Sequence, residues 1–461
     1  MIRETCRRKS RHAIRCNLAG LRQQYGRHQA GNQNPEIPGR KMAATETATE
    51  PLFILATNAG SSSIRYALFD AVDPPARSRG GKLELASVTR ADIALARGIG
   101  PVDLSPSVTA GDVRSQTAHF FDELEALPEF ASVKAVGHRI VHGMQHSAPE
   151  LVTPELIADL GRTVPFDPQH LPLEIGLMEI IAERHPAMLQ VACFDTAFHR
   201  TMPRVASVLP IPRRYEAAGV RRYGFHGLSY EFLMQELVRL GVPSATRGRV
   251  ILAHLGNGAS LAAIRDGQCI DTSMGFTPAS GLVMGTRSGD LDPGVISYLA
   301  RADGMSVGQF ETMTNEASGL LGVSESSADM RELLAREAMD VRAAEAIALF
   351  CYQTRKWIGA FSAALGGLDT LVFAGGIGEN LPTIRRRICE ELGYLGVSLA
   401  KEHNAANAQC ISADEAQVGV YVIPTDEELV IAQSVMRLIA KDAPTGKAHA
   451  TDQMSSRRHA T

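Results

Sequence analysis

Four side chains in this sequence occupy positions that a catalytic role explains more easily than a packing role does. Arg139 in GHRIVHG and Arg287 in MGTRSGD lie beside glycines, Asp195 follows an apolar run in CFDTAFH, and His226 lies between glycines in RRYGFHG. A single Asp or His in such a place is usually a cap or a turn residue. Together the four provide cations to hold a carboxylate and a transferring phosphoryl group, a carboxylate for Mg²⁺, and hydrogen-bond donors, which is what phosphoryl transfer needs.

Four segments rich in Gly, Ser and Asn follow apolar runs: Asn58–Ser63, His254–Ser260, Gly285–Gly289 and Gly375–Asn380. Glycine lets the backbone approach a ligand closely, and consecutive N–H groups in a turn can surround an anion. A single such turn is weak support for a ligand site, but four in one chain favour nucleotide binding. The sequence has no GxxxxGK[ST], which excludes a P-loop, and GGIGEN lacks the GxGxxG spacing of a dinucleotide-binding turn.

Two similar hairpins must position these turns. LFILATNAGSSSIRYALFD (52–70) and VILAHLGNGASLAAIRDGQ (250–268) each run from an apolar stretch through a polar turn into a second strand. FILATNAGSSSI aligns with VILAHLGNGASL without gaps at an offset of 197 residues. The repeat favours a duplicated domain with one such hairpin in each half. A chance match of two hairpins remains the alternative at this point.

Strand and helix patterns alternate along the rest of the chain, which predicts an α/β fold. The helix at 153–164 begins with Thr153 and Pro154, a typical start. The run at 341–365 is mostly apolar and predicts a long buried helix. The other predicted elements are strands at 133–144 and 188–199, a helix at 173–186, a strand from 370 entering a glycine turn that ends at 380, a helix after that turn, and a strand, turn and final helix over 420–440.

Composition narrows the class of protein. The 461 residues carry 47 Lys and Arg against 50 Asp and Glu, a net charge of −3 that gives no general attraction to nucleic acid. No apolar run reaches the roughly 18–20 residues of a membrane span. The seven cysteines have no CxxC spacing. In a chain of this length they predict reduced thiols in a cytoplasmic protein rather than a disulfide framework.

The two ends differ from the rest. Residues 1–41 hold ten Lys or Arg and two Glu, so the remaining chain has 37 basic and 48 acidic residues, a net charge of −11. Residues 1–50 are predicted to be a disordered basic extension, with translation starting near Met42 as one explanation and organellar targeting as another. No apolar core of a secretory signal is present. Residues 442–461 are polar and are predicted to form a disordered tail.

Nine strings in order over about residues 52–440 resemble the acetate kinase (acetokinase) family: NAGSSS, GHRIVHG, FDTAFH, YGFHG, HLGNGAS, DTSMGFTP, GLVMGTRSGDLDPG, GGIGEN and IPTDEE. This family belongs with the sugar kinases, actin and the heat-shock ATPases. The resemblance implies two duplicated actin-like (ribonuclease H-like) α/β domains with a nucleotide cleft between them. It places the N-terminal domain at 51–198 plus 427–441, and the C-terminal domain with the adenosine site at 199–426.

The resemblance also implies roles for individual residues. The implied catalytic residues are Arg139, Asp195, His226, Asn257 and Arg287. Mg²⁺ or Mn²⁺ would be held by Asn58, Asp195 and Glu427. The carboxylate substrate would be bound by Arg139 together with Val141, Gln169, Phe225 and Pro278. ATP or ADP would be bound by Ser61, Ser63, Arg65, His254, Leu255, Gly256, Asn257, Gly258, Asp329, Arg331, Gly375, Gly376, Ile377, Gly378, Glu379 and Asn380.

The sequence departs from the family pattern at four places. PFDPQHLPLE (165–174) replaces a Leu-His-Asn-Pro string, so that His170 is kept while Gln169 takes the place of an apolar pocket residue. Arg65 replaces a Lys, Asp426 an Asn and Ser280 a Glu. Gln169 bears on the choice of acid and Asp426 on the geometry of the metal site.

The sequence therefore predicts reversible phosphorylation of acetate by ATP to give acetyl phosphate and ADP, in a cytoplasmic homodimer without a nucleic-acid or membrane partner. A propionate or butyrate kinase is the nearest alternative. A catalytically silent nucleotide-binding protein on this fold and a nucleotide-hydrolysing, chaperone-like module are alternatives from other classes, because fold alone implies no activity. The intact set of Arg139, Asp195, His226, Arg287 and Glu427 argues against a silent protein, and a nucleotide-hydrolysing module would not need the two arginines.

Overall fold

The chain divides into two compact units, Met1–Glu50 and Pro51–Thr461. The computed structural model describes residues 52–60, 63–84, 92–94 and 113–442, all of them in the second unit. The predicted basic extension, the predicted tail beyond residue 442 and Ser61 lie outside the described residues.

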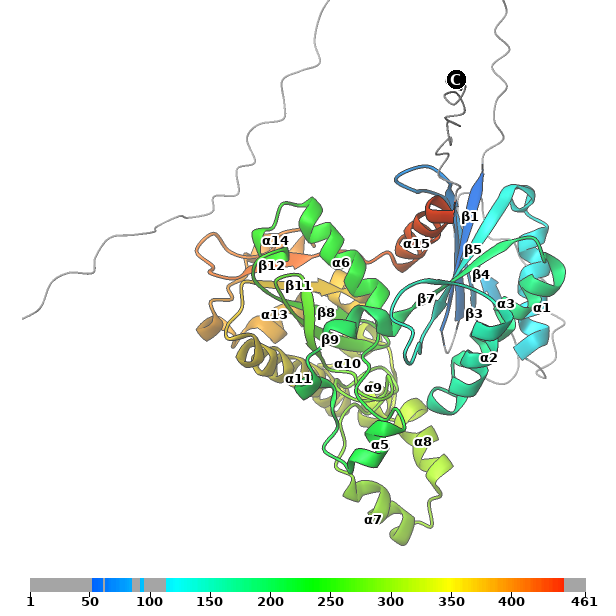
Figure 1. Ribbon diagram of the computed structural model, residues 1–461. Coiled ribbons are helices and arrows are strands. Elements are labelled where there is room, and N and C mark those ends of the chain that lie inside the picture. The colour runs from blue at the N-terminus through cyan, green and yellow to red at the C-terminus, as the bar shows by residue number, and fades with distance from the viewer. Residues whose placement is uncertain (1–51, 61–62, 85–91, 95–112, 443–461) are drawn as a thin grey trace, which may run out of the picture. The chain divides into compact units, whose positions relative to one another are not determined.

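The first half of the second unit is built on one sheet with the strand order β4-β3-β2-β1-β5-β7-β6 (Figure 1). Strands β1, β2 and β3 form an antiparallel meander, and β5 and β7 continue the sheet parallel to β1. The strands span Phe53–Ala59 (β1), Ser63–Asp70 (β2), Ala76–Glu84 (β3), Asp92–Ala94 (β4), Val133–Ile140 (β5), Glu150–Leu151 (β6) and Leu189–Phe194 (β7).

A second sheet repeats this plan with the order β10-β9-β8-β11-β12. Here β8, β9 and β10 form the antiparallel meander, and β11 and β12 continue parallel to β8. The strands span Arg249–Leu255 (β8), Ala259–Arg265 (β9), Gln268–Thr272 (β10), Thr370–Ala374 (β11) and Gly419–Val422 (β12). Because β8 occupies the place that β1 has in the first sheet, the duplication predicted from the two hairpins is confirmed.

Fifteen α-helices connect and cover the strands in the described part of the chain. The Thr153 side chain caps α2 by accepting a 3.2 Å hydrogen bond from the Leu156 N–H, as its sequence predicts. The helices span Val113–Glu125 (α1), Pro154–Thr163 (α2), Leu171–Arg184 (α3), Arg204–Ser207 (α4), Arg213–Ala217 (α5), Gly227–Arg239 (α6), Gly294–Ala302 (α7), Val307–Glu316 (α8), Gly319–Ser324 (α9), Met330–Arg336 (α10), Val341–Leu365 (α11), Gly375–Asn380 (α12), Pro382–Cys389 (α13), Lys401–Ala405 (α14) and Glu427–Asp442 (α15).

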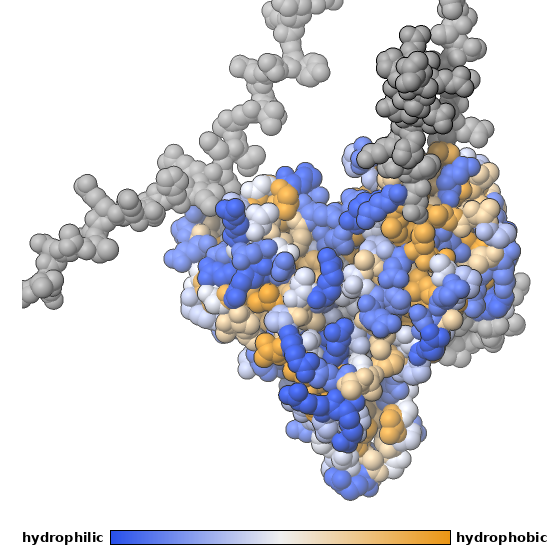
Figure 2. Space-filling view, in the orientation of Figure 1, coloured by the Kyte–Doolittle hydropathy of each residue, from blue (hydrophilic) through white to orange (hydrophobic). Residues whose placement is uncertain are grey.

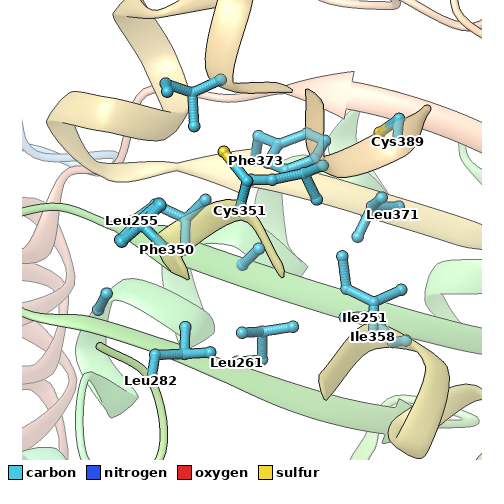
Figure 3. Packing of buried hydrophobic residues seen from close by; sticks show 14 of the residues in the cluster. Ile251, Leu255, Leu261, Leu282, Phe350, Cys351, Ile358, Leu371, Phe373 and Cys389 are labelled. Carbon is cyan, nitrogen blue, oxygen red and sulfur yellow. The ribbon is translucent and has the colours of Figure 1, made fainter. Parts of the chain in front are cut away.

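Two helices anchor the cores. Phe350 and Ile358 of α11 pack with Ile251, Leu261 and other side chains of the second sheet in one buried cluster (Figure 3). Burial of such a side chain contributes about 1.5–3 kcal/mol. The last helix, α15, packs instead against β1 and β5 of the first sheet. Gly137 makes this close approach possible, because a Cβ atom there would collide with side chains of α15.

Most predicted elements are confirmed, and α11 has the predicted bounds of 341–365. Two expectations are wrong. Gly375–Asn380 is a short helix and not a turn, and Gly285–Gly289 follows an irregular segment rather than a strand. Gly375 nevertheless has a φ of +75°, and a Cβ atom there would lie 2.7 Å from the Leu255 carbonyl oxygen. This close packing of β8 against α12 is what the glycine permits.

The surface and the thiols agree with the composition. Hydrophilic residues prevail over the face shown in Figure 2 and are interrupted by smaller apolar areas. Within the described residues, no helix is both long enough and apolar enough to cross a bilayer. The five described cysteines are free thiols, four of them buried; Cys6 and Cys16 lie outside the described residues.

Candidate active site

A cavity of about 790 Å³ is lined by residues that follow β1, β5, β8 and β11, together with the start of α15. The ends of strands collect here because β1 and β5 run parallel in one sheet, and β8 and β11 run parallel in the other. In α/β folds this is the edge of a sheet at which ligands bind. The cavity contains most of the residues that the sequence singled out.

Arg139, at the end of β5, is held by the fully buried carboxylate of Asp195. Its Nη2 and Nε donate to Asp195 Oδ2 over 2.6 and 3.2 Å, and its Nη1 donates to the Ala59 carbonyl over 3.1 Å. Burial alone would lower the pKa of Arg139, but the nearby Asp195 and Glu427 raise it instead. The guanidinium is therefore a fixed cation at the cavity wall.

Asp195 itself lies behind Arg139 and does not line the cavity. Besides Arg139, its carboxylate accepts hydrogen bonds from the backbone N–H groups of His226 and Leu228 over 3.1 and 3.2 Å. Both oxygens are thus occupied by protein donors. The first role that the geometry gives Asp195 is to hold Arg139 and the 226–228 segment in place.

His226 has a left-handed backbone with φ 59° and ψ 26°, which non-glycine residues adopt at a cost. Gly227 lets the segment pass directly over the Asp195 backbone, where a Cβ atom would collide. The ring packs against that of His254, and its Nδ1 lies 2.8 Å from Ser260 Oγ. Burial, the neighbouring His254 and the two arginines keep the pKa of His226 well below its usual value, so the imidazole is neutral at pH 7.

The side chains of His226 and Arg287 both lie close to Gly258 in the turn between β8 and β9. A Cβ atom on Gly258 would lie 3.3 Å from His226 Nε2 and 3.6 Å from Arg287 Nη1. The Asn257 carbonyl accepts a 3.0 Å hydrogen bond from the Gly285 N–H, which ties this turn to the loop that carries Arg287. A glycine at 258 thus leaves the two side chains open to a shared ligand.

Arg287 has fewer protein partners in the cavity than Arg139 has. Its Nη1 donates to the Pro278 carbonyl over 3.2 Å, and no carboxylate within the described residues forms an ion pair with it. Burial lowers the pKa of Arg287 against the opposing effect of the Asp167 carboxylate, but a guanidinium remains charged. A partly buried cation without an ion-paired anion is costly, and it indicates a site for an anionic ligand.

An acidic group lies at the start of α15. Asn58 Nδ2 donates to Glu427 Oε2 over 2.8 Å and to Glu428 Oε1 over 3.1 Å, and all three residues line the cavity. Burial first, and then the nearby Asp195 and Glu428, raise the pKa of Glu427 to about 7 against the lowering effect of Arg139. Asp426 does not line the cavity; its Oδ1 accepts a 2.5 Å hydrogen bond from Arg77 Nη2, which also donates to Glu428 Oε2 over 3.3 Å.

These residues fit a magnesium ion that shares its ligands with a nucleotide. The described residues include no cluster of three or more His, Cys, Asp or Glu that could hold a metal ion alone. Mg²⁺ usually binds one or two carboxylates, keeps several waters and takes the rest of its oxygens from phosphates. Glu427, Glu428 and the amide oxygen of Asn58 offer such a partial set at the cavity wall.

The far end of the cavity is lined by α12 and the start of α10. Glu379 Oε1 accepts hydrogen bonds from the N–H groups of Gly375 and Thr425 over 2.9 and 3.2 Å, so it supports the backbone of this wall. Asp329 caps α10 and pairs with Arg331 at 2.5 Å. Among the predicted nucleotide-binding residues, those that line the cavity are Ser63, Arg65, His254, Gly256, Asn257, Gly258, Asp329, Arg331, Gly375, Gly376, Ile377, Glu379 and Asn380.

Two predicted nucleotide-binding residues do not line the cavity. Leu255 is fully buried in the core of the second sheet, and the Gly378 backbone lies over Leu255 and Phe373. His170, which the sequence analysis noted as kept, and Gly60 of the Asn58–Ser63 turn also line the cavity. Residues that the sequence analysis did not single out and that line it are Ala328, Met330, Leu381, Thr425 and Glu428. Glu428 could have been predicted from the sequence, since it directly follows Glu427 in the string TDEE.

The predicted acyl-binding walls Val141, Phe225 and Pro278 line the cavity, but Gln169 does not. The Gln169 side chain is exposed, and the next residue, His170, is buried and lines the cavity. The expectation that Gln169 contacts the substrate is therefore corrected. Gln169 and His170 differ in this way because consecutive side chains at the start of α3 point in different directions.

The repeated sheets and a cavity that combines glycine-rich turns with two arginines define a nucleotide-using enzyme of the actin-like, duplicated α/β class. The chain belongs to the acetokinase family, whose sequence model matches residues 53–433. It is therefore an enzyme, a kinase of this family, and the silent nucleotide-binding protein is set aside.

Relatives agree with this assignment. The chain is 44% identical to an acetate kinase of Rhodopseudomonas palustris (strain TIE-1), over 84% of this chain and 98% of the relative. It is 40% identical to a propionate kinase of Citrobacter rodentium, over 85% and 98%. The crystal structure of Porphyromonas gingivalis acetate kinase superposes with a TM-score of 0.75 at 35% identity, covering 84% of this chain and all of that one. The predicted fold class, with two duplicated actin-like domains, is confirmed.

Proposed function

We propose that this enzyme transfers the γ-phosphoryl group of ATP to a carboxylate oxygen of acetate, reversibly and in one in-line step. The observation that carries the proposal is Arg287, a partly buried cation with no carboxylate at ion-pair distance among the described residues, whose side chain lies with that of His226 around Gly258. A positive charge and a neutral hydrogen-bond donor close together would stabilise a phosphoryl group during its transfer between two anionic oxygens.

The step needs no general base. A bond forms between a carboxylate oxygen and the γ-phosphorus, the bond from that phosphorus to the β,γ-bridging oxygen breaks, and its electrons leave with ADP. The carboxylate is already deprotonated at neutral pH, so no proton has to move. The protein's contribution is alignment and charge neutralisation.

Each residue has a part in this proposal. Arg139 and Arg287 orient the carboxylate and balance charge on the phosphoryl oxygens, and His226 and Asn257 contact the phosphoryl group. Asp195 is a positioning residue, because its oxygens already hold Arg139 and the backbone of 226 and 228. Mg²⁺, when bound, supplies charge neutralisation at the β- and γ-phosphates. Glu427, Glu428 and Asn58 would hold it.

Trapping the product tests the reaction. With ATP, Mg²⁺ and acetate, hydroxylamine should capture acetyl phosphate in equal amount to the ADP formed. ATP made chiral at the γ-phosphorus should give inverted configuration, as one displacement requires. ADP formation that does not depend on acetate would contradict the proposal and favour the nucleotide-hydrolysing alternative.

A second candidate is the same reaction on propionate. It is supported by the similarity to the Citrobacter rodentium enzyme and to the crystal structure of a Francisella tularensis propionate kinase, which has a TM-score of 0.76 at 34% identity over 83% of this chain and 98% of that one. A wall of Val141, Phe225 and Pro278 discriminates weakly between acids that differ by one methylene, by about 10–200-fold. The cytoplasmic location and the homodimer stay predictions.

A further inference from the structure

A buried glutamate of α3 holds the backbone at the end of β5. The ladder between β5 and β7 ends with the pair of Ile140 and Phe194. The next amide, the N–H of Val141, donates instead to the two carboxyl oxygens of Glu174 over 3.1 and 3.0 Å. Arg139 and Val141 both line the cavity. The hydrogen bond therefore holds the short segment that supplies a cation and an apolar wall to the cavity.

Packing alone does not explain a carboxyl group at this position. Glu174 is 1% exposed, and the Val141 N–H is its one hydrogen-bond donor among the described residues. Its side chain makes no bond to the N–H groups of its own helix. A buried carboxyl group with a single donor is costly, and an apolar side chain would fill the same space at no such cost. Such a cost is expected where the side chain serves a neighbouring site.

The surroundings of Glu174 favour its neutral form. Burial raises the pKa of Glu174 well above its usual range, against the lowering effect of Arg139 on β5. Asp167 ahead of α3 and Asp195 after β7 raise this pKa further. Arg139 already pairs with Asp195, and its Nε lies 3.9 Å from Glu427 Oε2. Another negative charge at position 174 would weaken the attraction of Arg139 for a substrate carboxylate, whereas a neutral acid still accepts a hydrogen bond.

We propose that Glu174 is a positioning residue for the acid substrate, and that it acts as a neutral hydrogen-bond acceptor that fixes the end of β5. Through the Val141 amide it keeps the Arg139 guanidinium and the Val141 side chain at the spacing that a carboxylate and its alkyl group require. Glu174 does not line the cavity, so it acts through these two residues. The inference rests on the proposed carboxylate kinase function and adds a residue on which substrate binding depends.

Steady-state kinetics with acetate and ATP varied separately test this role. Glu174→Leu removes the acceptor, and kcat/KM for acetate should fall by about 10–100-fold, since small displacements of positioning groups have effects of this order. KM for ATP should stay close to the wild-type value, because α10 and α12 line the far end of the cavity. Glu174→Gln keeps an uncharged acceptor of the same length and should behave like the wild type. Glu174→Asp is one methylene shorter and should resemble Glu174→Leu.

Glu183→Leu is the matched control, since Glu183 belongs to the same helix but has 60% of its side chain exposed; its kinetics should not change. Wild-type kcat/KM for acetate in Glu174→Leu would overturn the inference, and so would equal rises in the KM values for acetate and ATP. A loss of kcat/KM for acetate in Glu174→Gln would overturn it as well, even if Glu174→Leu does not fold. A wild-type enzyme that phosphorylates no acid would instead contradict the proposed function itself.

Discussion

Arg139 and Arg287 line the same cavity but differ in how the protein holds them. Arg139 is bound by the carboxylate of Asp195, whereas Arg287 donates to the backbone carbonyl of Pro278. A cation whose charge is already compensated changes little when an anion arrives. Arg287 is therefore the residue whose charge the transferring phosphoryl group should use most.

Replacing Arg287 tests this difference. Arg287→Leu should lower kcat by roughly 10²–10³-fold, the usual effect of removing one preorganised donor. Arg287→Lys should restore little, because lysine cannot donate in the fork geometry of a guanidinium. Steady-state kinetics with ATP and acetate measure both, and circular dichroism checks folding. A folded Leu variant with wild-type kcat would remove Arg287 from the mechanism.

The acidic group allows a separate prediction at the residue scale. Glu427→Gln removes a negative charge beside Asn58, so a higher Mg²⁺ concentration should be needed for half-maximal activity, and kcat should fall as well. Titrating Mg²⁺ at saturating ATP measures both effects. Glu402→Gln, in an exposed position of α14, is the control. An unchanged Mg²⁺ dependence in Glu427→Gln would show that this carboxylate is not near the metal.

At the scale of elements, short helix α12 depends on a buried arginine in α13. Arg385 has no solvent exposure, and its Nη1 donates to the carbonyl groups of Gly378 and Glu379 over 2.7 and 2.9 Å. Its Nε and Nη2 donate to Asn404 of α14 over 2.9 and 2.8 Å. Six residues cannot form a stable helix alone. The cavity wall at α12 therefore depends on this side chain.

Arg385→Leu should destabilise the fold and loosen that wall. Unsatisfied buried carbonyl groups cost about 1–3 kcal/mol of unfolding free energy, and the KM for ATP should rise. Urea unfolding and ATP titrations measure the two effects. Arg386→Leu is the control next in sequence, since Arg386 is exposed and, among the residues that the structure describes, forms its ion pair with exposed Glu390. Equal behaviour of the two variants would contradict the role given to Arg385.

At the scale of the molecule, the chain passes through the first sheet, builds the second, and returns with α15 to β1 and β5. We propose on this basis that residues 51–198 and 427–441 form one domain and residues 199–426 the other. Thr425, at the crossing point, bonds Ser229 of α6 over 2.9 Å, while Glu427 and Glu428 bind Asn58 after β1. The nucleotide cavity is then assembled from both domains.

Acid should destabilise the whole molecule through buried neutral histidines. His138 bonds Thr57 and Gln190 over 2.9 and 2.8 Å, and burial lowers its pKa to about 4 from 6.5. Between those two pH values the unfolded chain binds a proton that the folded protein excludes. The contribution of His138 is therefore complete above pH 6.5 and is lost as the pH falls toward 4, by about 3 kcal/mol at most.

Urea unfolding at pH 7.5 and at pH 5 measures this loss. His138→Gln should show a smaller difference in unfolding free energy between the two pH values than the wild type. His403→Gln, at an exposed position of α14, should match the wild type. An equal pH dependence in His138→Gln would assign acid sensitivity to other groups.

The amino-acid sequence by itself determined the elements, the duplication and the family. Hydrophobic periodicity and the aligned hairpins are local properties of the chain, so β1, β8 and α11 could be predicted from them. Arg139, Arg287 and His226 stood out for the same reason, because each lies in a short string whose residue types have a chemical meaning.

Only the tertiary structure decided which of two adjacent residues in a motif faces the cavity, and which groups that residue contacts. His170 and not Gln169 lines the cavity, because the direction of a side chain at the start of α3 depends on how that helix packs. Asp195 is saturated by Arg139 and by backbone groups more than 30 residues away in the chain. Hydrogen bonds between distant segments follow from the packing of whole sheets, and no local pattern records them.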